Sequence, residues 1–332
     1  MELEIVKEGC SVLDLMGFLG GLVEFVKGKV AEVEDREFAR RVEGTSPGGD
    51  PTFGVDLVAE EAVRTFVEGS DLPLVYLTED RGGVATSSCP RYLLVVDPID
   101  GTRPAAAGMG TFCVSAALAP YSDDARMRDV TCAALAVFGE DVKVMAEKGG
   151  GALIERNGKV LKPSPARFGK GDPIFWSMGF VGRPSRLLVE AMGDLIDENS
   201  VRGGFFVLNS ATYSATRILL GGFHAWVDVG KRIYDEVPAS GERFLALSEK
   251  PLGLFPYDVA AIYLIFRESN LPCTDARGLP WDDISLLDLS YDNATSALLA
   301  CSGELHEALL ARVDAGVRKL QLLASSHPVS LT

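Results

Sequence analysis

The chain has 332 residues, of which 47% are hydrophobic, and its formal net charge at pH 7 is −15. A chain of this length can bury a large core and can form two lobes that share it. The excess of carboxylates argues against nucleic acid or an anionic membrane as the main partner, because either would demand a basic face. It favours a protein that concentrates cations.

The six cysteines show no CxxC pair and no regular spacing, which is typical of a reduced, intracellular protein with ordinary buried thiols. The apolar segment 12–26 carries Asp14, Glu24 and three glycines, and no basic flank leads into a small-residue cleavage site. It therefore predicts an amphipathic helix rather than a signal peptide or a membrane span. Its charged continuation, 27–42, has a helical pattern, which would place one long first helix at the edge of a sheet. We expect a cytoplasmic protein.

Residues 44–51 (GTSPGGDP) are rich in turn formers and predict a loop. Apolar residues at helical spacing follow in 57–67, with Asp56 at the start of the helix. Capping that helix is the structural role open to Asp56. Residues 74–77 predict a short buried strand, and Glu79 follows its end, where an acidic residue is ordinarily solvated.

The stretch YLLVVDPIDGT, residues 92–102, places two carboxylates at one corner. Strand formers run from 92 to 96, and Pro98, which lacks a backbone donor, predicts that the strand ends at Asp97. Asp100 follows, and residues 101–102 offer a tight turn with backbone N–H groups that can meet an anion.

Such a corner suits a hard divalent cation. Mg²⁺ is held by carboxylate and carbonyl oxygens together with the phosphate of a substrate, and Asp97, the carbonyl of Ile99 and Asp100 could supply these oxygens. The alternative is that DPIDG only closes a loop, because Asp-Pro and Asp-Gly are common turn dipeptides.

The remaining elements alternate between strands and helices. Strands are predicted at 112–119, 130–138, 142–146, 174–178, 205–208, 225–229 and 297–301, and a hairpin at 149–161 with Asn157-Gly158 as its turn. Helices are predicted at 185–196, from 209–211 to about 220, at 256–269, and after Ser302, with Leu305, Leu309, Val313 and Val317 as a buried stripe.

Four motifs in this order resemble the superfamily of inositol monophosphatases and fructose-1,6-bisphosphatases, which are Mg²⁺-dependent, lithium-sensitive sugar phosphatases. They are GTSPGGDPTFGVD followed by LVAEEAV (44–63), LTED (77–80), DPIDGT (97–102) and PYDVAA (256–261). The first is similar to the archaeal dual-activity branch. The likeness extends from about residue 42 to the C-terminal helix and is patchy between 163 and 202. Four ordered motifs are more specific than one.

The resemblance implies an α+β fold, a layered αβαβα sandwich. An N-terminal lobe, 1–165, would carry most of the metal ligands, and a C-terminal lobe, 166–332, would carry the last ligand and the wall of the substrate site. Relatives are commonly dimers, so a homodimer is expected.

The resemblance also implies the metal site. Glu79, Asp97, the Ile99 carbonyl, Asp100 and Asp258 would hold two or three Mg²⁺ ions; Mn²⁺ could replace them and Li⁺ would inhibit. Asp80 would assist Glu79 from behind. Asp235 is a rival for the role of Asp258 as the last ligand. The structural alternative for Asp258 is that an acid in the first turn of a helix is favoured by the helix dipole even without a metal.

Catalytic roles follow from the same likeness. Asp56 and Thr102 would orient and deprotonate the attacking water, with Glu79 beside them. The N–H groups of Gly101 and Thr102 would bind the phosphate.

Substrate contacts are carried over for two residues. Ser210 would line the sugar pocket, in a turn where Asn209 replaces the glycine of relatives. Asp228 would accept hydrogen bonds from substrate hydroxyls, although an acid at a strand end is ordinarily exposed. Arg103 departs from the family pattern; it could pair with a phosphate as a planar fork or lie along the surface.

The segment 230–255 is longer than in small relatives and contains several cations. Lys231 and Arg232 are predicted to belong to a lid or wall that binds the non-reacting end of the substrate, such as a second phosphate. The alternative is a solvated insertion.

Taken together, the motifs predict a Mg²⁺-dependent phosphomonoesterase for a sugar or polyol phosphate, inositol-1-phosphate and/or fructose-1,6-bisphosphate. One alternative is a 3′-phosphonucleotide phosphatase. Aromatic residues that stack on a base would favour this activity, and the basic insertion, which is poor in aromatic residues, does not. Another is a catalytically weak homologue that binds metal or sugar phosphate for regulation. Every expected acid is present, which argues against this second alternative.

Overall fold

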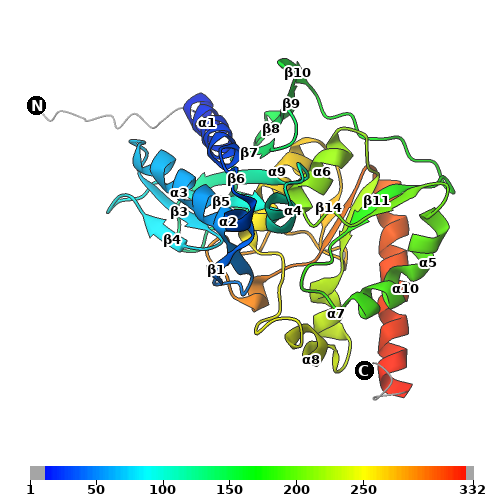
Figure 1. Cartoon of the computed structure of the whole chain (residues 1–332). Coiled ribbons are helices and arrows are strands. Elements are labelled where there is room, and N and C mark those ends of the chain that lie inside the picture. Colours follow the sequence, from blue (N-terminus) through cyan, green and yellow to red (C-terminus); the bar gives the residue numbers. More distant parts are fainter. Residues whose placement is uncertain (1–11, 327–332) are drawn as a thin grey trace, which may run out of the picture.

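The structure, a computed structural model, describes residues 12–326 and has five layers (Figure 1). Helices α1 (Val12–Ala31) and α3 (Gly54–Glu68) pack on one face of an eight-stranded sheet. Helices α6 (Ala211–Leu219) and α9 (Pro256–Glu268) lie between this sheet and a five-stranded one, whose outer face carries α5 (Ser185–Asn199) and α10 (Gly303–Ser326). The predicted layered α+β fold is therefore confirmed.

The eight-stranded sheet has the order β10-β9-β8-β7-β6-β5-β3-β4. Only β3 and β5 are parallel neighbours, and the other pairs are antiparallel. Its strands are β3 (Leu74–Thr78), β4 (Gly82–Ala85), β5 (Tyr92–Asp100), β6 (Cys113–Pro120), β7 (Cys132–Val137), β8 (Val142–Glu147), β9 (Gly151–Arg156) and β10 (Lys159–Leu161).

The five-stranded sheet has the order β12-β11-β13-β15-β14. Strand β11 runs parallel to both β12 and β13, whereas β15 is antiparallel to its neighbours. Its strands are β11 (Phe175–Met178), β12 (Gly204–Phe206), β13 (Ala225–Asp228), β14 (Cys273–Thr274) and β15 (Ala297–Ala300). The strands of the eight-stranded sheet thus all precede residue 162, and those of the five-stranded sheet all follow residue 174.

Burial explains why these segments take their places. Strand β7 is apolar and buried at every position, as a strand covered by helices on both faces should be. Ten of the eleven positions of helix α9 from Pro256 to Phe266 are buried, all except Asp258, and a helix that is apolar all round belongs inside a protein. It forms the middle layer against β5 to β8.

Short elements complete the fold. They are α2 (Arg36–Arg40), β1 (Val42–Thr45), β2 (Pro51–Phe53), α4 (Thr102–Ala107), η1 (Met127–Asp129), α7 (Gly230–Glu236), α8 (Ser240–Leu245) and η2 (Tyr291–Asn293). Strands β1 and β2 form a hairpin of their own, whose connection, 46–50, lies within the predicted loop 44–51, while the ends of that stretch belong to the two strands.

Two local predictions are confirmed. The turn of the β9–β10 hairpin is Asn157-Gly158, and both residues have positive φ, 50° and 71°, as a type I′ turn requires. At the start of α10 the Ser302 hydroxyl accepts the N–H of Leu305 at 3.3 Å, and the predicted stripe on this helix is buried.

The prediction of one long first helix at a sheet edge is wrong. Helix α1 ends at Ala31, and Asp35 begins a separate helix, α2, by accepting the N–H groups of Glu37 and Phe38 at 2.9 and 3.0 Å. Helix α1 also packs over β6 and β7, in the middle of the sheet, because its buried side chains Leu19, Leu22, Val23 and Val26 need a wide apolar face.

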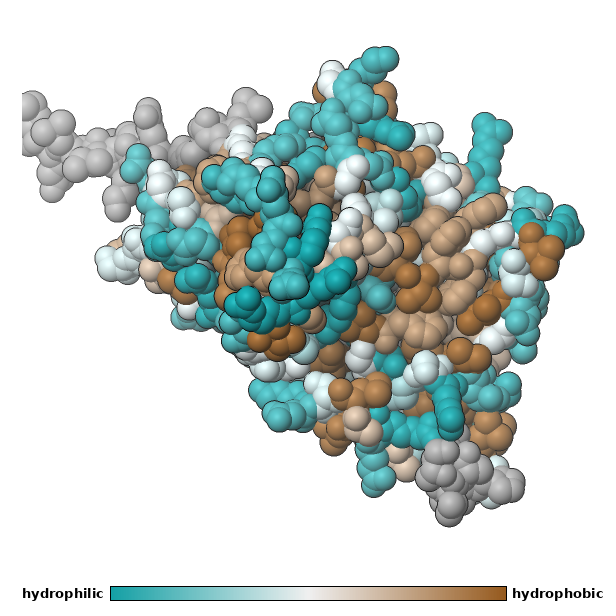
Figure 2. All heavy atoms as spheres, in the orientation of Figure 1, coloured by the Kyte–Doolittle hydropathy of each residue, from teal (hydrophilic) through white to brown (hydrophobic). Residues whose placement is uncertain are grey.

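The surface is mixed in character. On the face in Figure 2, apolar residues gather to the right of the centre, in the region where Figure 1 places β11 and its neighbours. Exposed apolar residues on and after these strands include Phe175, Phe206 and Val207. No helix within residues 12–326 is both long and apolar enough to cross a membrane. The five cysteines in this range are free thiols, and Cys10 lies outside the described residues.

The contact between α10 and α5 provides a test of the outer layer. A Cβ at Gly316 would lie 2.1 Å from the carbonyl oxygen of Ala191, whereas a Cβ at Gly303 would have no neighbour within 4 Å. We expect Gly316→Ala to lower the free energy of unfolding by about 1–3 kcal/mol through overpacking. Gly303→Ala, the matched control, should leave it unchanged or raise it slightly. Urea denaturation measures both, and equal stability of the two variants would contradict the packing.

Candidate metal and phosphate site

Three carboxylates meet at one point between the layers. Oxygen atoms of Asp97, Asp100 and Asp258 all lie within 4.8 Å of one another. Two come from β5 and the third from the first turn of α9. The geometry therefore brings together three of the four acids predicted as ligands, and it places Asp258 there, not its rival Asp235.

A bulge in β5 makes this meeting possible. Residues three apart on a regular strand point to opposite faces of the sheet. Along β6, however, Asp97 pairs with Ser115 and Asp100 with Cys113, so β5 contains one extra residue between the two acids. The prediction that the strand ends at Asp97 is therefore wrong, because the ladder resumes at Asp100 after the proline. Both carboxylates reach the same site.

Asp100 is held by the N-terminus of α6. Its carboxylate accepts the Ser210 hydroxyl at 2.8 Å, the backbone N–H groups of Ala211 and Thr212 at 3.2 and 2.5 Å, and the Thr212 hydroxyl. A helix N-terminus favours a negative charge. The predicted residue Ser210 therefore contacts a candidate ligand directly, in addition to lining the cavity.

The backbone around this contact requires special residues. Gly101 has φ 104°, and a Cβ there would lie 2.9 Å from the Cβ of Phe112 and 3.0 Å from that of Ser210. Asn209, which stands where relatives have glycine, has φ 55°. Asparagine is among the few residues with a Cβ that tolerate this conformation, so the departure from the family pattern preserves the turn.

Asp97 and Asp100 are buried, Glu79 and Asp258 are partly buried, and these acids repel one another. Burial raises the pKa of Glu79 well above its usual range, and the charges of Asp97 and Asp50 raise it further. Burial is also the main cause that raises the pKa of Asp97, and the negative charges of Asp100 and Asp258 raise it further. Burial also raises the pKa of Asp258. The N–H of Phe255, which donates to the Asp258 carboxylate at 2.6 Å, lowers this pKa and so opposes the rise. Such a cluster is stabilised by protons or by a cation.

Asp56 and Thr102 lie at the edge of the cluster. The Asp56 carboxylate accepts the N–H of Phe53 at 2.8 Å, so it does cap the start of α3, from the third helical position. Burial raises its pKa to about 7, and hydrogen bonds from Phe53 and from the Thr102 side chain oppose the rise. The Thr102 hydroxyl also lies 3.4 Å from the Ile99 carbonyl oxygen. The structural role and the predicted catalytic role are thus compatible.

Above the acids lies a cavity whose wall includes Glu79, Gly101, Thr102 and Arg103. Arg103 forms a bidentate ion pair with Asp50 of the 44–51 loop, at 2.6 and 2.5 Å. Arg103 was expected either to pair with a phosphate or to lie along the surface. It does neither, because its planar fork binds a carboxylate of the protein itself. The pair holds the loop over the site.

Asp228 lines the same cavity, and the expectation that it is merely exposed is wrong. It is 1% exposed and pairs with Arg183, whose Nη2 lies 2.7 Å from one carboxylate oxygen. Sequence reasoning missed Arg183, which lies in the region where the family likeness is patchy. No local signal marks it, because its partner is 45 residues away.

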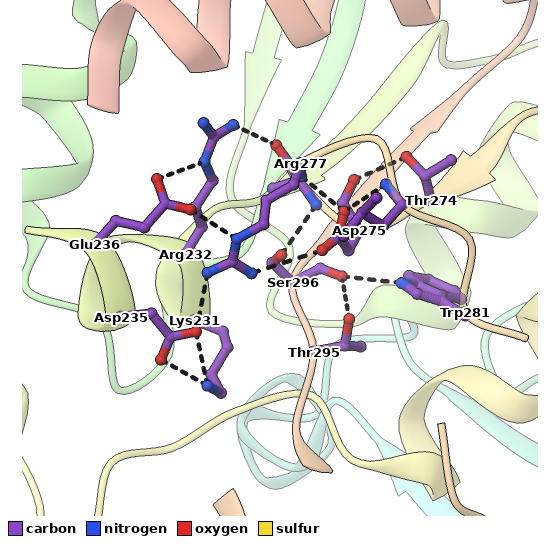
Figure 3. A network of polar contacts seen from close by, with 12 residues as sticks. Lys231, Arg232, Asp235, Glu236, Thr274, Asp275, Arg277, Trp281, Thr295 and Ser296 are labelled. Carbon is purple, nitrogen blue, oxygen red and sulfur yellow. Dashed lines mark hydrogen bonds and ion pairs between the residues drawn. The ribbon is translucent and has the colours of Figure 1, made fainter. Parts of the chain in front are cut away.

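The prediction that Lys231 and Arg232 bind substrate is wrong. Both are largely buried on α7, are not among the residues that line the cavity, and belong to the network drawn in Figure 3. Lys231 pairs with Asp235 at 2.6 Å, and Arg232 with Glu236 at 3.2 Å and Asp314 at 2.7 Å. These contacts neutralise both cations and join α7 to α10.

The insertion nevertheless contributes to the wall. Its last residues, Leu252 to Phe255, line the cavity with apolar side chains and backbone. Arg277 extends the network of Figure 3 by pairing with Glu236 and Asp235, at 2.6 and 3.0 Å. The end of the segment is therefore part of the cavity wall, whereas its cations Lys231 and Arg232 take part in ion pairs.

Glu60 is a second residue that sequence reasoning missed. It is 2% exposed, accepts the Thr78 hydroxyl at 2.9 Å and the Asp80 N–H at 3.2 Å, and so supports the two residues that flank Glu79. Asp80 in turn accepts a hydrogen bond from Thr52. The available signal was its position four residues after Asp56, on the buried face of α3.

The structure has the fold of the inositol monophosphatases. It matches a Pyrococcus horikoshii protein with similarities for inositol-1 monophosphatase (TM-score 0.65, 19% identity, 91% of this chain and 99% of that chain). It also matches the extragenic suppressor protein suhB of Bartonella henselae (TM-score 0.64, 17% identity, 90% and 98%).

A curated relative is more similar in sequence. The chain is 28% identical over 312 residues to the fructose-1,6-bisphosphatase/inositol-1-monophosphatase of Methanothermobacter thermautotrophicus, covering 88% of this chain and 94% of that protein. No model of a known protein family matches the chain. The resemblance carried by the four ordered motifs, to this superfamily and within it to the archaeal dual-activity branch, is thus confirmed.

Glu60 provides a pH test of this region. Burial is the main cause that raises its pKa from 4.5 to about 7. The stability it contributes is therefore fully present below its unfolded pKa and is lost as the pH rises through its folded pKa. Without metal, Glu60→Gln should reduce the loss of stability between about pH 5 and pH 8 by on the order of 3 kcal/mol, because the amide stays neutral.

Denaturation of the EDTA-treated proteins at the two pH values measures this difference. Glu61→Gln is the matched control, because Glu61 lies next to Glu60 but is exposed, and a hydrogen bond from Arg64 lowers its pKa. This control should not reduce the loss. A Glu60→Gln variant with the pH dependence of the wild type would show that Glu60 is charged in the folded protein.

Proposed function

We propose that the chain belongs to the inositol monophosphatase and fructose-1,6-bisphosphatase superfamily and is a metal-dependent phosphomonoesterase for a sugar or polyol phosphate. One observation carries the proposal: Asp97, Asp100 and Asp258 converge within 4.8 Å at a cavity between the layers. The name of the Methanothermobacter relative supports it. Cytoplasmic location and a homodimer stay predictions.

The donor set fits a hard divalent cation. Carboxylate oxygens are the ligands that Mg²⁺ and Mn²⁺ prefer, and the raised pKa values of Asp97 and Asp258 mark a site that gains from a positive charge. Asp97, Asp100, Asp258, Glu79 and the Ile99 carbonyl would hold it. When bound, Mg²⁺ supplies Lewis acidity toward the phosphate and lowers the pKa of water.

Asp56 and Thr102 act on the water. Asp56 has a pKa near 7, so its carboxylate can accept a proton at neutral pH, where a general base is most effective. Thr102, whose side chain lowers the pKa of Asp56, would align the water together with it. The rigid start of α3 fixes Asp56, since its other contact is the backbone of Phe53.

The turn after β5 binds the phosphate. Gly101 has no side chain and lies in the cavity wall with Thr102, so their backbone N–H groups are accessible to phosphate oxygens. Arg103, already paired with Asp50, keeps the 44–51 loop against the site rather than binding phosphate.

The cavity favours a sugar phosphate over a nucleotide. Three of the aromatic residues that line it, Trp226, Phe255 and Tyr257, are at most 4% exposed and cannot offer a ring face to a base. Phe180 is partly exposed. Base stacking requires accessible aromatic faces. The convergence of Asp97, Asp100 and Asp258, with Glu79 in the wall of the same cavity, supports turnover over a purely regulatory role.

Phosphate release tests the function directly. Inositol-1-phosphate, fructose-1,6-bisphosphate and 3′-phosphoadenosine 5′-phosphate are compared with Mg²⁺ and with EDTA. We expect Mg²⁺-dependent turnover of a sugar phosphate, and a loss of at least about a hundredfold in kcat for Asp97→Asn, because this variant lacks one of the charges that hold the cation.

Asp235→Asn is the matched control, because Asp235 is an acid of α7 that belongs to the ion-pair network and not to the cluster. This variant should keep its turnover. Turnover of the nucleotide alone would favour the phosphonucleotide activity, and Mg²⁺ binding without turnover of any substrate would favour the regulatory homologue.

A further inference from the structure

Arg183 is a buried cation in the wall of the cavity. It is 7% exposed and comes from the connection after β11, on the side of the C-terminal sheet. Its Nη2 and Nε lie 2.7 and 3.4 Å from the two oxygens of Asp228, and its Nη1 donates to the Val181 carbonyl. A buried arginine with a fixed side chain is suited to recognition.

The donors of Arg183 are not exhausted by these contacts. A guanidinium has five N–H groups, and three are used, one each on Nε, Nη1 and Nη2. Within residues 12–326, no acceptor is found for the second N–H of Nη1 or of Nη2. Two donors on neighbouring nitrogens form the fork that matches a carboxylate or a phosphate.

Two glycines leave room for the pair. A Cβ at Gly179 would lie 2.4 Å from a carboxylate oxygen of Asp228, and one at Gly230 would lie 2.7 Å from Cγ of Arg183. Any side chain at either position would displace one partner. The backbone is therefore shaped around the ion pair, which makes it a built feature of the wall.

The position of the pair relates it to the reacting end. Asp228 and Arg183 line the same cavity as Asp97, Asp100 and Gly101 but come from the other sheet. The cations first expected to bind the far end of the substrate, Lys231 and Arg232, are neutralised elsewhere. Arg103, the other arginine of this wall, is committed to Asp50.

We infer that Arg183 determines specificity by binding a second anionic group on the leaving part of the substrate, a phosphate or a carboxylate. Asp228 is its resident counterion and orients its fork. Asp228 has little capacity left for substrate hydroxyls, because one oxygen accepts both Nε of Arg183 and the N–H of Gly230, at 2.9 Å. This inference rests on the proposed function and narrows it to substrates with two anionic groups.

Two matched pairs of substrates test it with Mg²⁺ present. Fructose-1,6-bisphosphate and fructose 1-phosphate differ in a phosphate; glucuronic acid 1-phosphate and glucose 1-phosphate differ in a carboxylate. In at least one pair, the doubly anionic member should have the higher kcat/KM, and Arg183→Lys should lower this ratio about tenfold, because lysine lacks the fork. The pair that responds identifies the anionic group.

Arg312→Lys is the matched control, since Arg312 is an exposed arginine paired with Glu198. It should leave the ratios at the wild-type value. If Arg183→Lys lowers the turnover of both members of each pair in parallel, or if the wild type prefers neither doubly anionic substrate, the inference is wrong while the phosphatase activity stands.

The wild-type protein provides a readout that needs neither the variant nor turnover. Calorimetry with Mg²⁺ compares fructose 6-phosphate with fructose, and glucuronic acid with glucose, as ligands. In at least one pair, the acidic member should bind about tenfold more tightly than its neutral partner. Failure of all turnover with this preference intact would overturn the proposed function alone. Equal binding of acidic and neutral ligands would overturn the role of Arg183.

Discussion

Like-charged carboxylates buried within a few ångströms of one another are the constraint on which the rest of the site depends. Desolvation and mutual repulsion both penalise their ionised forms, which is why the pKa values of Glu79, Asp97 and Asp258 are raised. A fold tolerates such a cluster only if the backbone imposes it and if protons or cations relieve it. The site is therefore a place where stability is given up for binding.

Regular secondary structure supplies the imposed positions. The extra residue in β5 turns two acids toward one site, the N-terminus of α6 donates hydrogen bonds to Asp100, and the first turn of α9 fixes Asp258 through Phe255. Each contact uses backbone N–H groups that the element must satisfy in any case. The ligands are thus oriented before any cation binds, and they lie between layers that exclude most of the solvent.

Much of the site was predictable because its residues are local. DPIDGT contains two carboxylates and the turn glycine, and the resemblance of PYDVAA to the family motif pointed to Asp258. The role of Arg183 was not predictable, since it depends on a partner from another strand and on room left by Gly179 and Gly230. The error over Lys231 was avoidable: Asp235 lies four residues later, at the spacing of a helical ion pair.

The central claim is that a divalent cation replaces protons in the acidic cluster. It is tested most directly by titrating the EDTA-treated, dialysed protein with Mg²⁺ near pH 7 in buffers of different ionisation enthalpy, which gives the number of protons released per ion bound. The account predicts binding with net release of protons, and loss of that release in Asp97→Asn. Mg²⁺ binding without proton release would show that the buried acids are already ionised, and no binding would remove the metal site altogether.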